Sequence, residues 1–251
     1  MTSPSDKEEK EWQEPLRTIK QHVLPLASIE RFYGPKNNVE VDFFVGPKIF
    51  TINGKNKNFV ASRAWTQFAE DGTTVYEADF QSAVEELLQN KSITESHKRV
   101  FSRFYALIKA RSEARYTKVP RGTTMTDLSP APARTEEQVL RDERRGIFYC
   151  TDEDDIERVV KDMAIIQSVL ATERRVDQWG LLVSTGPEFL VGDDFSQCAR
   201  IPITPYAYLA WNAENRFLSA AQVHEMNRDI KKLSRNFCFA RSLDACWKGL
   251  L

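Results

Sequence analysis

Hydrophobic and polar residues follow two different periods along the chain, and the changes of period separate strand-like from helix-like segments. Between positions 39 and 61, Val, Ile, Phe and Thr fill three short runs, VEVDFFV, KIFTI and NFVAS. Gly46-Pro47 and Asn53-Gly54 separate these runs, and Asn-Gly is a strong hairpin signal because both of its residues accept a positive φ. The pattern predicts two or three antiparallel strands in this region.

A helical period of about 3.6 residues follows the predicted strands. The segment ADFQSAVEELLQN collects most of its apolar side chains on one face. A second helix is expected from Thr94 onward, where an apolar stripe between Val100 and Ile108 lies opposite basic residues. Both segments are long enough to cover a sheet or to pack against each other.

Two capping boxes mark later helices, because a Ser or Thr followed three residues later by Glu or Gln satisfies the first backbone N–H groups of a helix. Thr135-Glu-Glu-Gln138 and Ser219-Ala-Ala-Gln222 have this form, and the segment from about 152 to 171 also keeps a helical period. The apolar runs GIFYC, WGLLVST, EFLVG, IPI, AYLAW and NFCFARS indicate strands. The sequence predicts an α+β fold: an N-terminal antiparallel hairpin with long helices, then a small mixed or antiparallel sheet with packed helices.

One domain is the leading expectation for a chain of 251 residues. A charged stretch precedes it, and the segment VPRGTTMTDLSPAPA, at 119–133, is a Pro- and Thr-rich loop without periodicity. The predicted segments are a disordered tail at 1–15, a single α+β domain at 16–243 with halves 16–118 and 134–243, and a C-terminal tail at 244–251.

The charge balance excludes few functions. The chain has 35 Lys and Arg against 36 Asp and Glu, which argues against a globally basic nucleic-acid-binding protein. We expect no membrane partner, because the chain has no run of about 18 apolar residues and no apolar signal core near its start. Four scattered cysteines without Cys-x-x-Cys spacing favour reduced thiols and a cytoplasmic location.

The motif Gly192-Asp193-Asp194, after the apolar run EFLV, is the most suggestive group of acidic residues. Asp193 and Asp194 are candidate metal ligands, for Mg or Mn if the protein is a hydrolase, because hard cations prefer oxygen ligands. The alternative is structural, since Asp in a turn commonly accepts backbone N–H bonds. The sequence leaves both roles open.

Three histidines are scattered without the spacing of metal ligands. His97 falls on the polar side of its predicted helix, so we expect a solvated surface residue. His22 lies in the apolar stretch HVLPL, so we expect it to be partly buried and hydrogen-bonded. A structural role and a role as general base remain alternatives for His22. P-loop and Rossmann motifs are missing, so the sequence supports no nucleotide cofactor site, and the cofactor stays unknown.

Basic residues cluster along the helix that follows Thr94 and along its exit, interleaved with aromatic residues. Such a stripe can neutralise phosphates, and a tyrosine within it offers a surface on which a nucleic-acid base can stack. The alternative is an ordinary solvated face paired with nearby glutamates. The candidate nucleic-acid-binding residues are Arg99, Arg103, Arg115, Tyr116 and Arg121.

The stretch QHVLPLASIERF resembles the entry motif of a bacterial family of unassigned activity, domain-of-unknown-function family 4238. His22, Pro25, Ile29 and Phe32 match that motif in spacing. Further motifs follow in the family's order: KIFTI, NFVASRAWTQF, ALIKARS, WGLLVSTGPEFLVGDDF, IPITPYAYLAW and VHEMNRDIKKLSRNFCFARS. The resemblance spans about 16–243.

The resemblance departs at the acidic turn. The family's Ser-Asp-Asn-Pro reads Gly-Asp-Asp-Phe in this chain, so that only Asp193 matches. The family's polar motif positions correspond to His22, Arg111, Asp193 and Asn227. The resemblance implies a cytoplasmic bacterial protein from mobile or variable genome regions, and it implies no established activity.

Two hypotheses use these four residues differently. In a phosphate-ester hydrolase, a metal-dependent nuclease or nucleotide hydrolase in a phage-defence or toxin-like setting, they would share one cleft as catalytic residues. Asp193 would then be metal ligand or base, Arg111 would bind phosphate and His22 would transfer protons. In a non-catalytic interaction or sensor protein with an unknown protein partner, they would form buried structural contacts. We expect the second, and the accessibility of Asp193 and His22 distinguishes the two.

Overall fold

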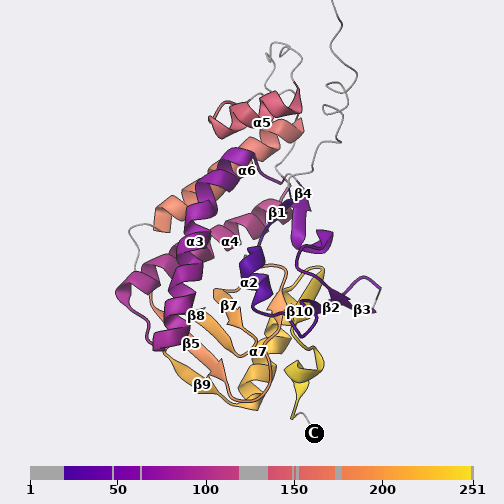
Figure 1. Ribbon diagram of the computed structural model, residues 1–251, viewed down its shortest axis with the longest axis vertical. Helices are drawn as coiled ribbons and strands as arrows, with labels where there is room; N and C mark the ends of the chain where they lie inside the picture. The colour runs from indigo at the N-terminus through magenta and orange to yellow at the C-terminus, as the bar shows by residue number, and fades with distance from the viewer. Residues whose placement is uncertain are drawn as a thin grey trace, which may run out of the picture.

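The structure, a computed structural model, confirms the α+β class: the longest helices gather in one part of the molecule, and the two four-stranded sheets lie in the other (Figure 1). The predicted tail at 1–15 and the whole of the predicted loop at 119–133 lie outside the residues whose placement is described. The described residues are 20–46, 48–62, 64–118, 135–148, 150, 153–172 and 177–249.

Helices and strands follow each other in an irregular order along the chain. The helices are α2 (Leu26–Glu30), α3 (Gln67–Asn90), α4 (Glu95–Tyr116), α5 (Glu136–Arg144), α6 (Glu153–Thr172) and α7 (Ala220–Leu233), with 3₁₀ turns η1 (Lys57–Phe59) and η2 (Asp244–Trp247). The strands are β1 (Lys20–His22), β2 (Val39–Phe43), β3 (Lys48–Ile52), β4 (Val60–Ser62), β5 (Trp179–Ser184), β6 (Val191–Gly192), β7 (Arg200–Thr204), β8 (Ala207–Trp211), β9 (Arg216–Leu218) and β10 (Phe237–Ala240).

A four-stranded sheet in the order β7-β8-β5-β9 separates the helices α3, α4 and α6 from α7. Side chains alternate between the faces of a strand. Trp179 and Leu209 therefore share a core with the three helices, whereas Leu182 and Tyr208 face α7. The indole Nε1 of Trp179 donates to Oγ of Ser102 in α4 at 2.9 Å, which joins the helices to the sheet.

A second four-stranded sheet, in the order β3-β2-β10-β6, connects the two ends of the chain. β2 pairs with β3 in the predicted hairpin, and with the late strand β10 on its other side. The rings of Phe59 and Phe239 pack edge-on with their centroids 5.2 Å apart. Residues from 16–118 and from 134–243 thus share one sheet and one hydrophobic core.

The predicted hairpin at Asn53-Gly54 is wrong. β4 pairs with β1 and not with β3, and the positive φ lies at Gly46, at 73°, in the turn between β2 and β3. Gly54 is needed for a different reason. Its N–H donates to the hydroxyl of Tyr33 at 3.0 Å, and a Cβ at this position would lie 2.8 Å from that oxygen.

Two further segments differ from the sequence pattern. GIFYC forms no strand over its described residues: Gly146 takes a φ of 74° after α5, and Phe148 packs edge-on against Phe68. The chain also stays ordered beyond position 243, where a tail was expected. Cys246 in η2 is fully buried.

The N-terminus of α3 is held by carboxylates from two other helices. The N–H of Thr66 donates to Oδ1 of Asp162 in α6 at 2.7 Å, and its hydroxyl donates to the other carboxylate oxygen. The N–H of Gln67 donates to Oε2 of Glu143 in α5 at 3.1 Å. Carboxylates are favourable here because the first N–H groups of a helix lack partners within it.

This arrangement predicts a pH-dependent contribution to stability from Asp162. Burial raises the pKa of Asp162 from 3.8 to about 6, helped by the charge of Glu143 and opposed by the hydrogen bonds from Thr66 and by Arg158. The folded state therefore binds the proton more tightly than the unfolded state does. Stability from this group is fully present below about pH 4 and is lost as the pH rises through about 6, by about 3 kcal/mol.

Asp162→Asn tests this contribution, because an amide can accept from the Thr66 N–H and donate to the Thr66 hydroxyl. We expect the variant to gain stability relative to the wild type as the pH rises from 4 to 7, in urea unfolding measured at several pH values. Asp79→Asn, at an exposed carboxylate of α3, serves as the control. Parallel pH profiles for the wild type and Asp162→Asn would contradict the prediction.

Candidate functional site

The four candidate catalytic residues are at four places in the fold: His22 in β1, Arg111 in α4, Asp193 directly after β6, and Asn227 in α7. The buried ones are Arg111, Asp193 and Asn227, while His22 is half-buried. Their side chains take part in separate hydrogen-bond networks.

Arg111 is 1% exposed and lies among the helices. Its Nη1 donates to Oε1 of Glu77 at 2.6 Å and to the backbone oxygen of His22 at 3.2 Å. Its Nη2 donates to Oγ1 of Thr73 at 3.0 Å and to Oε2 of Glu70 at 3.2 Å. Burial raises the pKa of Glu77, while the charge of Arg111 acts in the opposite direction. Both terminal nitrogens of the guanidinium thus donate hydrogen bonds to carboxylates of α3.

His22 contacts Arg111 through its backbone oxygen, and its imidazole has another partner. The ring Nε2 lies 3.3 Å from the backbone oxygen of Gly54. The strand pairing of His22 with Val60 fixes the backbone at this point. The partial burial expected for His22 is confirmed. Its imidazole and the Arg111 guanidinium are bonded to different elements.

Asp193 is 4% exposed and binds the connection between α7 and β10. Its Oδ1 accepts the N–H of Arg235 at 2.8 Å, and its Oδ2 accepts the N–H of Asn236 at 3.0 Å. The hydroxyl of Tyr116 also donates to Oδ2, at 2.6 Å. A Cβ at Gly192 would lie 2.4 Å from a side-chain oxygen at the end of α7, so a glycine is needed for β6 to approach this connection.

Asp194 pairs with the same connection. The Nε of Arg235 donates to its Oδ2 at 2.5 Å, and the N–H of Ser196 donates to its Oδ1 at 2.8 Å, as in an Asx turn. All four carboxylate oxygens of Asp193 and Asp194 therefore accept protein donors, and a cation would have to displace them. Among the described residues, no group of three or more His, Cys, Asp and Glu is arranged to hold a metal ion. The geometry favours the structural turn.

Asn227 is fully buried and joins three segments. Its Oδ1 accepts the N–H of Leu190 at 2.9 Å. Its Nδ2 donates to the backbone oxygens of Glu188 at 2.8 Å and of Cys246 at 3.1 Å. These contacts hold η2 and the segment before β6 against α7.

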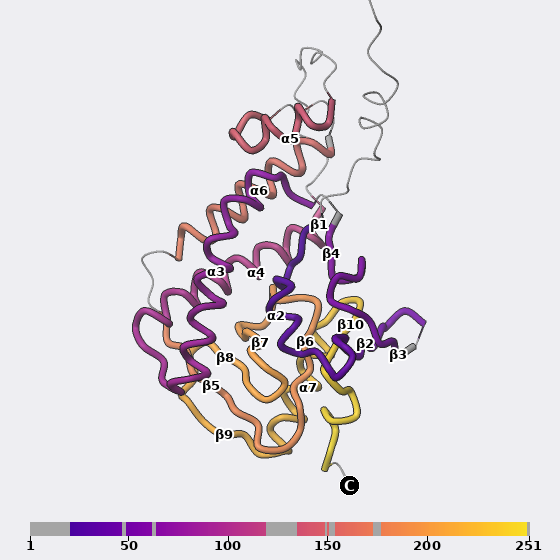
Figure 2. The backbone as a smooth tube through the Cα atoms, viewed as in Figure 1, coloured from indigo at the N-terminus to yellow at the C-terminus, as the bar shows by residue number. Residues whose placement is uncertain are grey.

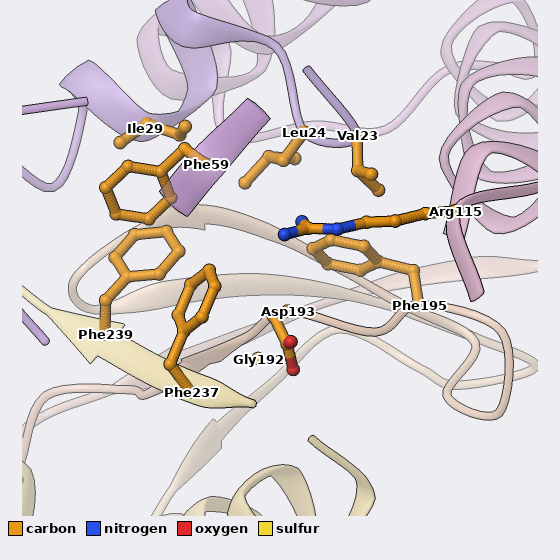
Figure 3. A pocket seen from close by; sticks show the side chains of 10 residues that line it. All are labelled: Val23, Leu24, Ile29, Phe59, Arg115, Gly192, Asp193, Phe195, Phe237 and Phe239. Atoms are coloured by element: carbon orange, nitrogen blue, oxygen red, sulfur yellow. The ribbon is translucent and has the colours of Figure 1, made fainter. Parts of the chain in front are cut away.

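A cavity of about 20 Å³ lies beside Asp193 (Figure 3). Arg115 extends across it next to the ring of Phe195, and three phenylalanine rings lie on the opposite side. A space of this size holds about one water molecule. The cavity is therefore too small for a nucleotide or a phosphate ester.

The predicted basic stripe does not form a continuous exposed face on α4. Arg99 is exposed, Arg103 is half-buried and Arg111 is buried in the network described above. Arg121 lies outside the described residues. The buried Arg111 therefore interrupts the described part of the stripe, which continues with the half-buried Arg115.

Tyr116, the predicted stacking residue, is bound by two arginines. The guanidinium carbon of Arg115 lies 5.3 Å from the centroid of its ring, and that of Arg235 lies 4.7 Å away. Arg115 also donates to the backbone oxygen of Asn58 at 3.1 Å. Burial and the carboxylate of Asp193 raise the pKa of the Tyr116 hydroxyl. A base could stack on this ring only in competition with the arginines.

The prediction that His97 is a solvated surface residue is wrong. Its exposed fraction is 5%. The N–H of Thr94 donates to its Nδ1 at 3.3 Å, which completes a capping box at the start of α4. Its Nε2 lies 3.0 Å from Oε2 of Glu86. At position N3 of a helix, the histidine ring can fold back over the helix N-terminus and become buried there. A helical-wheel pattern shows only the side of the helix on which a residue lies, so it does not indicate this burial.

Sequence reasoning missed the partners of Arg111. Glu70, Thr73 and Glu77 are spaced so that they share one face of α3, and this spacing is a signal that could have indicated a buried cation. The buried carboxylate of Glu188 was also missed. It accepts from Nε of Arg241 at 2.9 Å.

Comparisons with protein-family models, with curated proteins and with solved structures found no match. The resemblance to domain-of-unknown-function family 4238 therefore stays a prediction from short motifs. None of the helices within the described residues is both long and apolar enough to cross a membrane.

Proposed function

We propose that the protein is a non-catalytic interaction protein that binds an extended segment of a partner at the outer edge of β3. The observation that carries the proposal is that β3 is an edge strand of its sheet and exposes large apolar side chains. Ile49 is 64% exposed, Phe50 is 45% exposed, and Val45 in the adjoining turn is 88% exposed. An apolar edge strand offers backbone groups and side chains to an added strand.

The strand register identifies the backbone groups that point outward. The N–H of Phe44 donates to the chain just before β10 at 2.9 Å. Backbone groups alternate in direction along a strand. The N–H and C=O groups of Val41, three residues before Phe44, therefore point the other way, toward β3, where Val41 is opposite Phe50. Phe50 is therefore bonded inward, and Ile49 and Thr51 direct their N–H and C=O groups to the outer edge.

Charge indicates the kind of segment that fits. Lys36, Lys55 and Lys57, which lie within a few residues of β2 or β3 along the chain, are exposed, and none forms an ion pair with a described residue. The acidic residues of β2 are already engaged, Glu40 by a backbone N–H and Asp42 by a lysine of α7. A second copy of the chain would bring lysines together, whereas an acidic partner would neutralise them. The expected partner segment is extended, apolar in its centre and acidic at its ends.

The hydrolase hypothesis lacks comparable support. It requires His22, Arg111, Asp193 and Asn227 around one cleft, and their side chains are bonded to different elements. The same contacts agree with the hypothesis of a structural role for these residues.

Thr51→Pro tests the proposal by removing an outward N–H donor. The probe is a synthetic peptide of alternating valine and threonine with aspartates at both ends, labelled for fluorescence anisotropy. We expect the wild type to bind it and Thr51→Pro to bind it about tenfold more weakly, since a lost hydrogen bond costs about 1 kcal/mol or more. Thr51→Val keeps the N–H and should keep the affinity.

Proline is tolerated on edge strands, and circular dichroism with the urea midpoint checks that the variant is folded. Ile49→Glu serves as a second variant, which removes an apolar side chain and adds negative charge that repels the acidic peptide, and it should also weaken binding. Failure of the wild type to bind the peptide, or equal affinities of Thr51→Pro and Thr51→Val, would contradict the proposal. Dimerisation of the free chain through β3 in sedimentation would contradict the choice of partner.

A further inference from the structure

A cleft of about 510 Å³ opens between α7 and the sheet β7-β8-β5-β9. Sites for small molecules commonly have volumes of about 300–1,000 Å³. In Figures 1 and 2, α7 and this sheet lie at the end of the molecule away from α5. The cleft belongs to a different sheet from the β3 edge, so an inference about it does not depend on the proposed interaction function.

The floor of the cleft is apolar. Leu182 and Leu218 of the sheet and Met226 of α7 line it, and all three are buried members of the core between the sheet and α7. Ala210 lies in the same lining and leaves room above the sheet because its side chain is small. An apolar group of a ligand would extend this core.

Two arginines project from the sheet on the side of this floor. Arg200 is opposite Ala210 in the pairing of β7 with β8. Arg216 is opposite Leu182 in the pairing of β9 with β5. Residues that are opposite each other share a face of the sheet, so both guanidinium groups lie on the face that α7 covers.

Two carboxylates project from α7 at the other wall. Glu225 and Asp229 are four residues apart, hence on one face of the helix, and both line the cleft. Nη2 of Arg200 lies 3.7 Å from Oδ2 of Asp229, too far for a hydrogen bond, and Nη1 of Arg200 has no hydrogen-bond partner. Arg216 and Glu225 form no ion pair with any described residue. Two of the four charged groups, Arg216 and Glu225, thus have no ion-pair partner among the described residues, while Arg200 and Asp229 face each other in a long ion pair.

The balance of signs selects the ligand class. A dianion would meet two carboxylates and a dication would meet two guanidinium groups, whereas a molecule with one charge of each sign complements both walls. We propose that the cleft binds a small zwitterion with an apolar side chain, an amino acid or a short peptide. Its carboxylate would lie against Arg200 and Arg216, its ammonium group against Glu225 and Asp229, and its side chain on the apolar floor.

Matched peptides test the proposal by isothermal titration calorimetry on the full chain. The probes are leucine and leucyl-leucine, with N-acetyl-leucyl-leucine lacking the ammonium group and leucyl-leucine amide lacking the carboxylate. We expect at least one zwitterion to bind and each capped form of the dipeptide to bind about tenfold more weakly or worse, because a charged hydrogen bond is lost. Equal binding of a capped form, or no binding of either zwitterion at millimolar concentration, would overturn the proposal.

Substitutions locate the site. Arg216→Gln and Glu225→Gln change exposed side chains of the cleft and should each weaken binding of the zwitterion about tenfold. Arg228→Gln changes an exposed arginine of α7 outside the lining and should leave the affinity unchanged. Binding that both cleft variants retain in full would show that the ligand occupies another place and would overturn the assignment.

Discussion

Replacing Arg111 by methionine is expected to lower the free energy of unfolding by about 3–5 kcal/mol. Methionine keeps an unbranched side chain but leaves Glu70 and Glu77 without a cation, where burial already raises the pKa of Glu77. The hydroxyl of Thr73 and the backbone oxygen of His22 lose a donor as well. Domains have a total stability of about 5–15 kcal/mol, so the loss should be visible as a large shift of the urea midpoint.

Two further variants separate the ion network from other effects. Adding Glu77→Gln to Arg111→Met removes one of the uncompensated carboxylates and should recover part of the loss. Arg99→Met, at an exposed position of the same helix, should change stability by less than about 0.5 kcal/mol. A loss below about 1 kcal/mol for Arg111→Met would contradict a structural role and favour a free, ligand-binding guanidinium.

Asp193→Ala is the second substitution with a large expected effect, a loss of about 2–4 kcal/mol. Two backbone N–H groups, of Arg235 and Asn236, and the hydroxyl of Tyr116 lose their acceptor in a buried place. The Asp193 carboxylate helps to raise the pKa of Tyr116. Removing it should therefore lower that pKa, which spectrophotometric titration can follow against Tyr116→Phe.

The matched controls for Asp193 are Asp193→Asn and Asp79→Ala. Asparagine retains one acceptor oxygen and should lose less stability than alanine, while alanine at the exposed Asp79 should have almost no effect. A variant Asp193→Ala with unchanged stability would show that the carboxylate does not serve the fold. The hypothesis of a metal or catalytic site would then regain support.

Local chemistry explains which parts of the fold were predictable. The capping boxes at Thr135 and Ser219 are complete within four residues, and the structure confirms both helices. The β2–β3 hairpin likewise depends on neighbours along the chain. The hairpin expected at Asn53-Gly54 does not form because β4 pairs with β1, where Ala61 is opposite Gln21, 40 residues earlier in the chain.

The partners of the candidate residues could not be predicted for the same reason. The motif positions indicated that Arg111, Asp193 and Asn227 matter, and all three are buried. Their roles depend on groups far away in sequence, such as Glu77, 34 residues from Arg111, and Tyr116, 77 residues from Asp193. A residue type shows that a buried polar group needs a partner, and only the fold shows which partner it has.

The central claim is that a partner strand pairs with the outer edge of β3, and amide hydrogen exchange followed by NMR tests it most directly. The acidic valine–threonine peptide should slow exchange at the amides of Ile49 and Thr51 by about tenfold or more, because these N–H groups become hydrogen-bonded. The amide of Phe50, already bonded to β2, should change little. Peptide binding that leaves Ile49 and Thr51 unchanged while protecting amides elsewhere would contradict the account.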